Sequence, residues 1–94
     1  MGEVEAVLRS IDGVADAVLI TTSDAAGAER LTAFVVLTPG SPSPSVATIR
    51  TAVAQQTAEQ MVPAEIRFLD GIPRLANFKP DLMSLRAMSR LHHG

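Results

Sequence analysis

Two strand-like runs joined by a short polar turn constrain this chain more than any other feature. The first run covers residues 14–22 and the second covers residues 31–38, with small and polar residues between them. Such a pair predicts an antiparallel hairpin. In the second run the side chains alternate between two faces, one with Leu31, Ala33, Val35 and Leu37, the other with Thr32, Phe34, Val36 and Thr38. Because both faces carry bulky side chains, we expect helices to pack against one face and the other face to be partly covered.

The pattern before the hairpin predicts a helix over residues 3–11. Its apolar residues recur with helical spacing and form one stripe: Val4, Val7, Leu8 and Ile11. Gly13 follows as a natural stop. The helix begins almost at the first residue with no capping residue before it, and we therefore expect that the chain is part of something longer.

Three more elements are predicted after the hairpin: a helix over residues 45–60, a strand over residues 64–70 and a helix over residues 81–90. Ser43 and Pro44 are a suitable N-cap and first-turn pair for the first of these helices, and Asp81 is a suitable cap for the last. The order predicts a small α+β fold: a three-stranded sheet, made of an antiparallel hairpin plus a third strand, with three helices packed against it.

Composition excludes several classes of protein. The 94 residues suffice for one small domain, and a net charge of −2 with no basic cluster argues against nucleic acid as the main partner. There is no cysteine, hence no disulfide framework or thiolate metal site, and no apolar run is long enough to span a membrane. We therefore expect a cytoplasmic protein. His92 and His93 could together hold a metal ion, but a solvated chain end is the interpretation we favour, and no metal site is predicted.

Lys79 is the candidate functional residue. It is the only lysine beside seven arginines, and it lies in a predicted loop just before the last helix. Pro73 and Pro80 restrict the backbone on both sides of it. A lysine is a compact point charge that can reach a phosphate or a carboxylate, although most lysines are solvated surface residues. The local sequence leaves both interpretations open.

Three separated stretches resemble one family. They are Gly2-Glu3-Val4-Glu5 at the start, Met61-Val62-Pro63 before the third strand, and the run from Leu69 to Asp81 that contains Ile72-Pro73-Arg74 and Asn77-Phe78-Lys79. In this order and spacing they resemble the C-terminal subdomain of adenylate-forming enzymes. That superfamily includes acyl-CoA synthetases, luciferases and the adenylation domains of peptide synthetases. The resemblance covers nearly the whole chain.

The resemblance implies that residues 1–94 are a single C-terminal subdomain and that Lys79 is catalytic. In such enzymes a large N-terminal domain binds ATP, with Mg²⁺, and a carboxylic acid. The small domain closes over it and delivers the lysine to the reacting carboxylate and α-phosphate. It then rotates for thioester formation with CoA or carrier pantetheine. This chain alone is expected to bind none of these cofactors and to be inactive, and its implied partners are the N-terminal domain and the acid.

Three residues depart from the family's closing motif. Phe78 stands where the family has glycine before the lysine, Pro80 where it has isoleucine or valine, and Leu82 where it has arginine. Glycine adopts backbone conformations that phenylalanine tolerates poorly, so the lysine loop is expected to take an altered path. The uncapped first helix and the bulk on both sheet faces also predict an exposed apolar face and self-association of the isolated chain. The alternative function is a free-standing α+β binding module without catalysis, since fold does not fix function.

Overall fold

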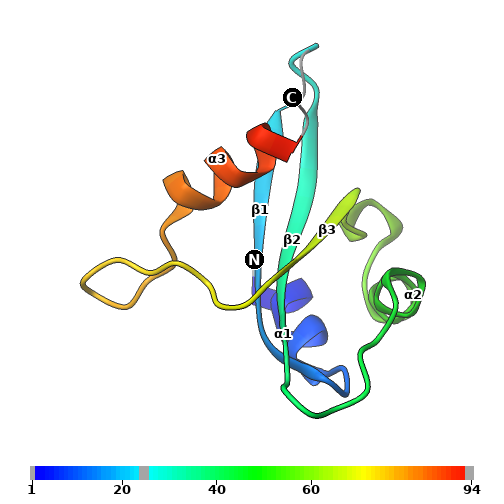
Figure 1. Ribbon diagram of the computed structural model, residues 1–94. Helices are drawn as coiled ribbons and strands as arrows, with labels where there is room; N and C mark the ends of the chain where they lie inside the picture. Colours follow the sequence, from blue (N-terminus) through cyan, green and yellow to red (C-terminus); the bar gives the residue numbers. More distant parts are fainter. Residues whose placement is uncertain (1, 24–25, 93–94) are drawn as a thin grey trace.

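A mixed sheet of three strands forms the middle layer of the protein (Figure 1). The computed structural model describes residues 2–23 and 26–92. Strands β1 (Val14–Ser23) and β2 (Glu29–Leu37) form an antiparallel hairpin, and β3 (Glu65–Leu69) pairs in parallel with β2. A parallel neighbour requires a long crossover connection, which α2 (Val46–Gln56) supplies here. The predicted hairpin with a third strand is confirmed.

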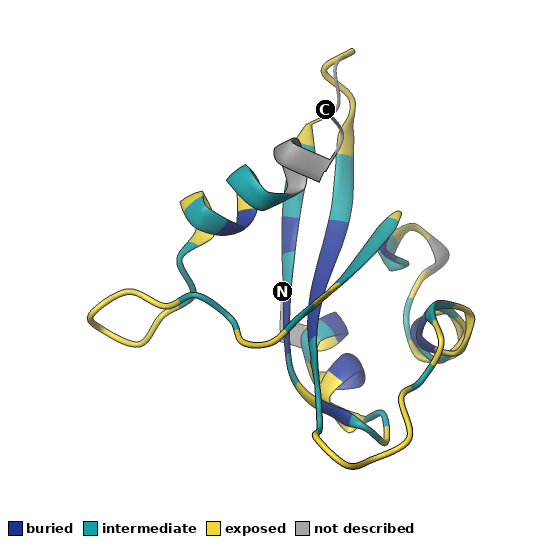
Figure 2. Cartoon of the chain, viewed as in Figure 1, coloured by how far each residue is buried: buried dark blue, intermediate teal, exposed yellow. Residues whose placement is uncertain are grey.

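Helices α1 (Gly2–Ser10) and α2 pack on one face of the sheet. The buried residues of this layer come from both helices and from β1 and β2: Val4, Val7, Leu8, Val14, Ala17, Ala33, Val35, Ile49 and Val53. Figure 2 shows these buried segments where the helices meet the sheet. The apolar stripe predicted for the first helix therefore faces the core.

Helix α3 (Leu82–His92) covers the opposite face of the sheet. Phe34 and Leu85 are completely buried there, and Val18 and Ile20 are nearly so. The predicted alternation along β2 is therefore confirmed, with Val35 on the face of α1 and α2 and Phe34 on the face of α3. The predicted α+β fold with three helices is confirmed as well.

The predicted boundaries of the second helix are wrong at both ends. Its N-cap is Ser45 and not Ser43, since Ser45 Oγ accepts a hydrogen bond from Thr48 N (3.1 Å). The helix stops at Gln56 because Thr57 is extended, and both the N–H and the hydroxyl of Thr57 donate to Val53 O (2.9 and 2.8 Å). A separate 3₁₀ turn, η1 (Glu59–Met61), then leads towards β3.

Side chains from α1 protect the outer edge of β1. The Glu5 carboxylate accepts a hydrogen bond from the Leu19 N–H (2.9 Å), and Arg9 Nη2 donates to Ala17 O (2.9 Å). An edge strand presents unpaired backbone groups on which another strand can pair. These two contacts satisfy such groups and also hold α1 against β1.

Candidate functional site

Lys79 lies on a small hairpin-like loop that projects from the sheet between β3 and α3 (Figure 1). We call residues 73–81 the Lys79 loop. Its two sides are joined by hydrogen bonds from Leu75 N to Lys79 O and from Asp81 N to Pro73 O, both 2.8 Å long. Within residues 2–23 and 26–92, no hydrogen bond or ion pair engages the exposed Lys79 ammonium. The fold therefore presents this cation on a braced loop and leaves it free to meet an anion.

The tip of the Lys79 loop is a tight turn with one residue in the left-handed region. Phe78 N donates to Leu75 O (2.9 Å), and Lys79 N donates to the side chain of Asn77 (3.0 Å). Phe78 has φ +68°, the position that glycine occupies when a turn ends with a left-handed residue. A non-glycine residue there costs about 1–2 kcal/mol. The loop therefore keeps a conformation that glycine would allow, at the cost of strain at Phe78, and the altered path expected from the loss of glycine is not observed.

Replacing Phe78 by glycine should stabilise the domain by about 1 kcal/mol, because the relieved strain exceeds the chain entropy that glycine adds. The Phe78 side chain is 80% exposed, so that little apolar burial is lost. Urea unfolding of the two proteins measures the difference. As a matched control, Ala76→Gly in the same turn should destabilise, since Ala76 has no positive φ. A Phe78→Gly protein that unfolds at lower urea than the parent would contradict this account.

Large apolar side chains are exposed around the Lys79 loop. In the part of the chain that the structure describes, five are at least 42% exposed: Phe68, Leu75, Phe78, Leu82 and Met83. Four of these five lie between residues 75 and 83. The predicted exposed apolar surface is therefore present, and most of it lies beside Lys79.

An ion-pair cluster at Asp16 anchors the start of the Lys79 loop. Asp16 Oδ1 accepts from Ala17 N (2.8 Å) and from Arg9 Nε (3.3 Å), and Asp16 Oδ2 accepts from Arg74 Nη2. Burial alone would raise the pKa of Asp16. The hydrogen bonds from the Ala17 N–H and from the two guanidiniums outweigh it, so the pKa of this carboxyl lies below its usual value.

Sequence reasoning missed the contact between Asp16 and Arg74. The two residues are 58 positions apart, and no periodicity relates them. The available signal was an acidic residue inside an otherwise apolar strand, since a charged side chain in a strand usually has a partner nearby. Asp16 lies at a register shift in β1, where the pairing with β2 is irregular.

Asp81 fixes the other end of the Lys79 loop to α3. Its carboxylate accepts from the Ser84 hydroxyl (2.8 Å) and from Ser84 N (3.1 Å), and these hydrogen bonds hold the pKa of Asp81 below its usual value. The predicted cap is confirmed. Both ends of the loop are therefore tied to the folded body, one through Asp16 and one through a helix cap.

The lowered pKa of Asp16 and of Asp81 predicts a loss of stability in acid. A carboxyl whose pKa is lower in the folded state stabilises that state above its unfolded pKa of about 3.9, and the contribution disappears as the pH falls through the folded pKa. The free energy of unfolding from these groups should therefore hold above about pH 5 and decrease below about pH 4. Urea unfolding at several pH values checks this. The Asp16→Asn/Asp81→Asn double variant should show a shallower acid loss; an equal loss in both proteins would refute the assignment.

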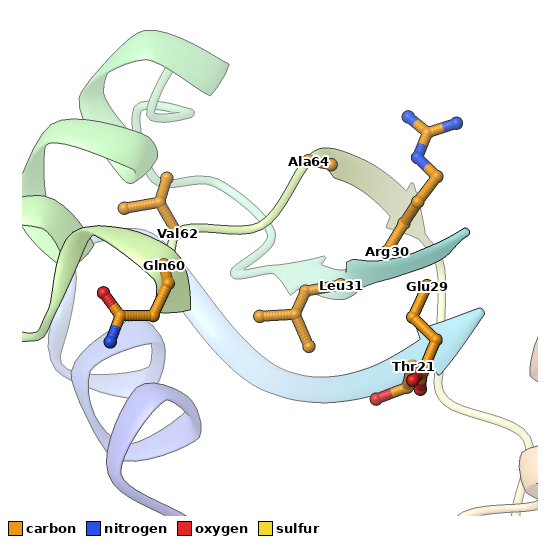
Figure 3. A pocket seen from close by; sticks show the side chains of 7 residues that line it. All are labelled: Thr21, Glu29, Arg30, Leu31, Gln60, Val62 and Ala64. Carbon is orange, nitrogen blue, oxygen red and sulfur yellow. The ribbon is translucent and has the colours of Figure 1, made fainter. Parts of the chain in front are cut away.

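A second concave surface lies away from the Lys79 loop. This groove, of about 400 Å³, lies between the turn end of the β1–β2 hairpin and the segment around η1 (Figure 3). Its lining residues are Thr21, Glu29, Arg30, Leu31, Gln60, Val62 and Ala64. Figure 3 shows the Arg30 side chain pointing away from Glu29. Because its charged groups do not converge, the groove shows no arrangement for a specific ligand.

The described residues were also compared with what metal binding and membrane spanning require. Among the described residues, no group of three or more His, Asp or Glu side chains could hold a metal ion. The His92–His93 pair lies outside the described side chains. None of the helices described is long and apolar enough to cross a membrane.

The comparisons with known proteins agree with this geometry. Residues 3–79 match the family model of the AMP-binding enzyme C-terminal domain. The chain is 39% identical over 87 residues to an isonitrile lipopeptide synthase from Streptomyces coeruleorubidus, with 93% of this chain and 6% of that protein covered. It is also 39% identical over 72 residues to the fatty acid–[acyl-carrier-protein] ligase ScoC from the same organism, covering 77% of this chain and 14% of the ligase.

A solved structure gives the same result for the fold. The fatty acyl CoA synthetase of Mycobacterium tuberculosis superimposes with a TM-score of 0.80 at 26% identity, over 92% of this chain and 17% of that one. The chain thus spans a small part of the length of each relative named above. The family match covers most of the sequence and ends at Lys79. This chain therefore belongs to the AMP-binding enzyme C-terminal domain family, found in acyl-CoA synthetases and related adenylating ligases.

Proposed function

We propose that this domain is the mobile C-terminal lid of an ATP-dependent enzyme that adenylates a carboxylic acid, and that Lys79 is its catalytic residue. The observation that carries the proposal is the exposed ammonium of Lys79, which has no partner among the described residues, on a loop tied to the body at both ends. Adenylation joins a carboxylate to the α-phosphate of ATP. Because negative charge develops there in the transition state, a positioned cation stabilises it.

Of the groups that ATP carries, the described residues of this domain fit only a phosphate. An exposed lysine at a loop tip fits a phosphate oxygen, since it is a compact charge on a flexible stem. The described residues hold no acidic cluster for Mg²⁺. ATP, Mg²⁺ and the acid would therefore be bound mainly by the large N-terminal domain, which is the proposed partner of this chain.

The proposal includes a second step with a thiol acceptor. After the adenylate forms, the domain rotates so that another of its surfaces helps to admit the thiol of CoA or of a carrier's pantetheine. Such alternation assembles two sites in turn. The relatives support a thiol acceptor, since one ligates fatty acids to an acyl-carrier protein and one is a fatty acyl CoA synthetase. This role would place the protein in the cytoplasm, where ATP is supplied.

The exposed apolar side chains beside Lys79 support contact with the large domain. Leu75, Phe78 and Met83 would be covered when the lid closes, and left uncovered they would promote self-association of the isolated chain. The protected edge of β1 makes strand pairing along that edge an unsuitable route for the association. A free-standing binding module is the less favoured alternative, because the relatives named above carry this domain as a small part of a long chain.

The test is ATP–pyrophosphate exchange with three proteins: the intact adenylating enzyme, the enzyme without this domain, and the 94-residue chain alone. We expect exchange by the intact enzyme, a loss of about 100-fold or more without the lid, and none by the isolated chain, because catalysis requires both halves of the site. Measurable exchange by the isolated chain, or unchanged exchange by the truncated enzyme, would refute the proposed function.

A further inference from the structure

Arg74 connects the tip of the Lys79 loop to the sheet. Its guanidinium donates from Nη1 to Phe78 O (2.9 Å) and from Nη2 to the Asp16 carboxylate. Phe78 is the strained residue immediately before Lys79. One side chain therefore holds the carbonyl next to the lysine and ties it to β1.

Asp16 is itself held on the folded body. Its carboxylate accepts hydrogen bonds from Ala17 N and Arg9 Nε, and Arg9 also donates to Ala17 O. These contacts join α1 to the start of β1. A continuous series of hydrogen bonds thus runs from α1 through Asp16 and Arg74 to the residue before Lys79.

These contacts are better suited to orienting the Lys79 loop than to stabilising the fold. The Asp16 and Arg74 side chains are 29% and 36% exposed, and ion pairs at such positions contribute little to folding free energy. A planar guanidinium, however, holds two acceptors in a fixed geometry, which a lysine cannot do. A displacement of about 1 Å in a catalytic group can slow a reaction by about 100-fold.

We propose that Asp16 and Arg74 are positioning residues for Lys79, an inference that rests on the proposed catalytic role of this lysine. Arg74 keeps Phe78 in its left-handed conformation, and Asp16 fixes the guanidinium that does so. The Lys79 side chain then extends from the loop at a defined position. Without either residue the loop relaxes the strain at Phe78 and the ammonium is displaced.

The experiment uses Arg74→Gln, Arg74→Lys and Asp16→Asn in the intact enzyme. Each should lower kcat for adenylate formation by about 10-fold or more, the scale expected for a displaced catalytic group, with KM for ATP and for the acid within about twofold of the parent. Thioester formation from supplied acyl-adenylate should be unchanged. The Asp16→Asn/Arg74→Gln double variant should be no slower than the worse single variant, since both act through one contact.

Arg50→Gln is the matched control. Like Arg74, Arg50 donates two hydrogen bonds, in its case to the backbone carbonyls of Pro63 and Ala64, but it lies on α2, away from the Lys79 loop (Figure 1). This variant should keep the adenylation rate of the parent. If the Arg74 and Asp16 variants adenylate within twofold of the parent, or slow both half-reactions equally, the positioning role is wrong.

The failure of this inference can be told apart from the failure of the proposed function. If Lys79→Ala slows adenylation and Arg74→Gln does not, only the positioning role fails. If Lys79→Ala has no effect, the proposed function fails. Hydrogen exchange of the Leu75 and Phe78 amides, both hydrogen-bonded within the loop, should be faster in Arg74→Gln than in the parent, and equal exchange would also overturn the inference.

Discussion

Lys79→Ala in the intact enzyme should slow adenylate formation by about 100-fold or more, the range expected when one electrostatic donor to a developing charge is lost. Thioester formation from supplied acyl-adenylate should change much less, because the resemblance to the family implies that the lysine faces away in that state. Lys79→Arg should restore only part of the rate, since a broad planar group replaces a compact charge. Both half-reactions are measured separately, by pyrophosphate exchange and by thioester formation.

Arg30→Ala is a charge-matched control for Lys79→Ala. It also removes one positive charge, but Arg30 lines the groove at the far end of the hairpin and not the Lys79 loop. The adenylation rate of this variant should equal that of the parent. The stability of Lys79→Ala should also be nearly unchanged, since its ammonium has no partner among the described residues. An adenylation rate of Lys79→Ala within about twofold of the parent would show that Phe78-Lys79-Pro80 serves another purpose.

The two faces of β2 could be predicted because side-chain direction alternates along a regular strand. The alternation of residues along the strand was enough to predict that Phe34 and Val35 lie on opposite faces. Helix ends were less predictable because they depend on single hydrogen bonds. Ser43 and Ser45 are equally good capping residues in sequence, and only the backbone of the preceding loop selects Ser45.

The candidate site was predictable in part. Lys79 and the departure at Phe78 could be found by comparison with a family motif, and the positive φ of Phe78 agrees with the glycine expected at that position. The anchor of the loop could not be found in this way. The contact of Asp16 with Arg74 joins β1 to a loop 58 residues later, and only the folded topology brings such distant charges together.

Gly13→Ala should destabilise the domain by about 3 kcal/mol, as the sum of a left-handed backbone and a steric clash. Gly13 has φ +93°, which alone costs alanine about 1–2 kcal/mol. A Cβ atom would also lie 2.6 Å from Pro42 O and 3.1 Å from Pro44 Cδ. The backbone cannot easily move away, since Gly13 O accepts a hydrogen bond from Thr38 N (2.8 Å). Urea unfolding measures the loss.

Gly40→Ala separates the two causes. Gly40 also has a positive φ, +80°, but beyond its two neighbours in the chain no described atom lies within 4 Å of a Cβ built there. Its substitution should therefore cost only the backbone contribution, about 1–2 kcal/mol, and the remaining difference measures the clash at Gly13. If Gly13→Ala is no less stable than Gly40→Ala, the close approach to Pro42 does not contribute to the loss of stability. The Gly13→Ala enzyme should lose both half-reactions in proportion to the fraction of protein that is unfolded. Lys79→Ala should lose mainly adenylation, so the two variants distinguish damage to the fold from damage to the chemistry.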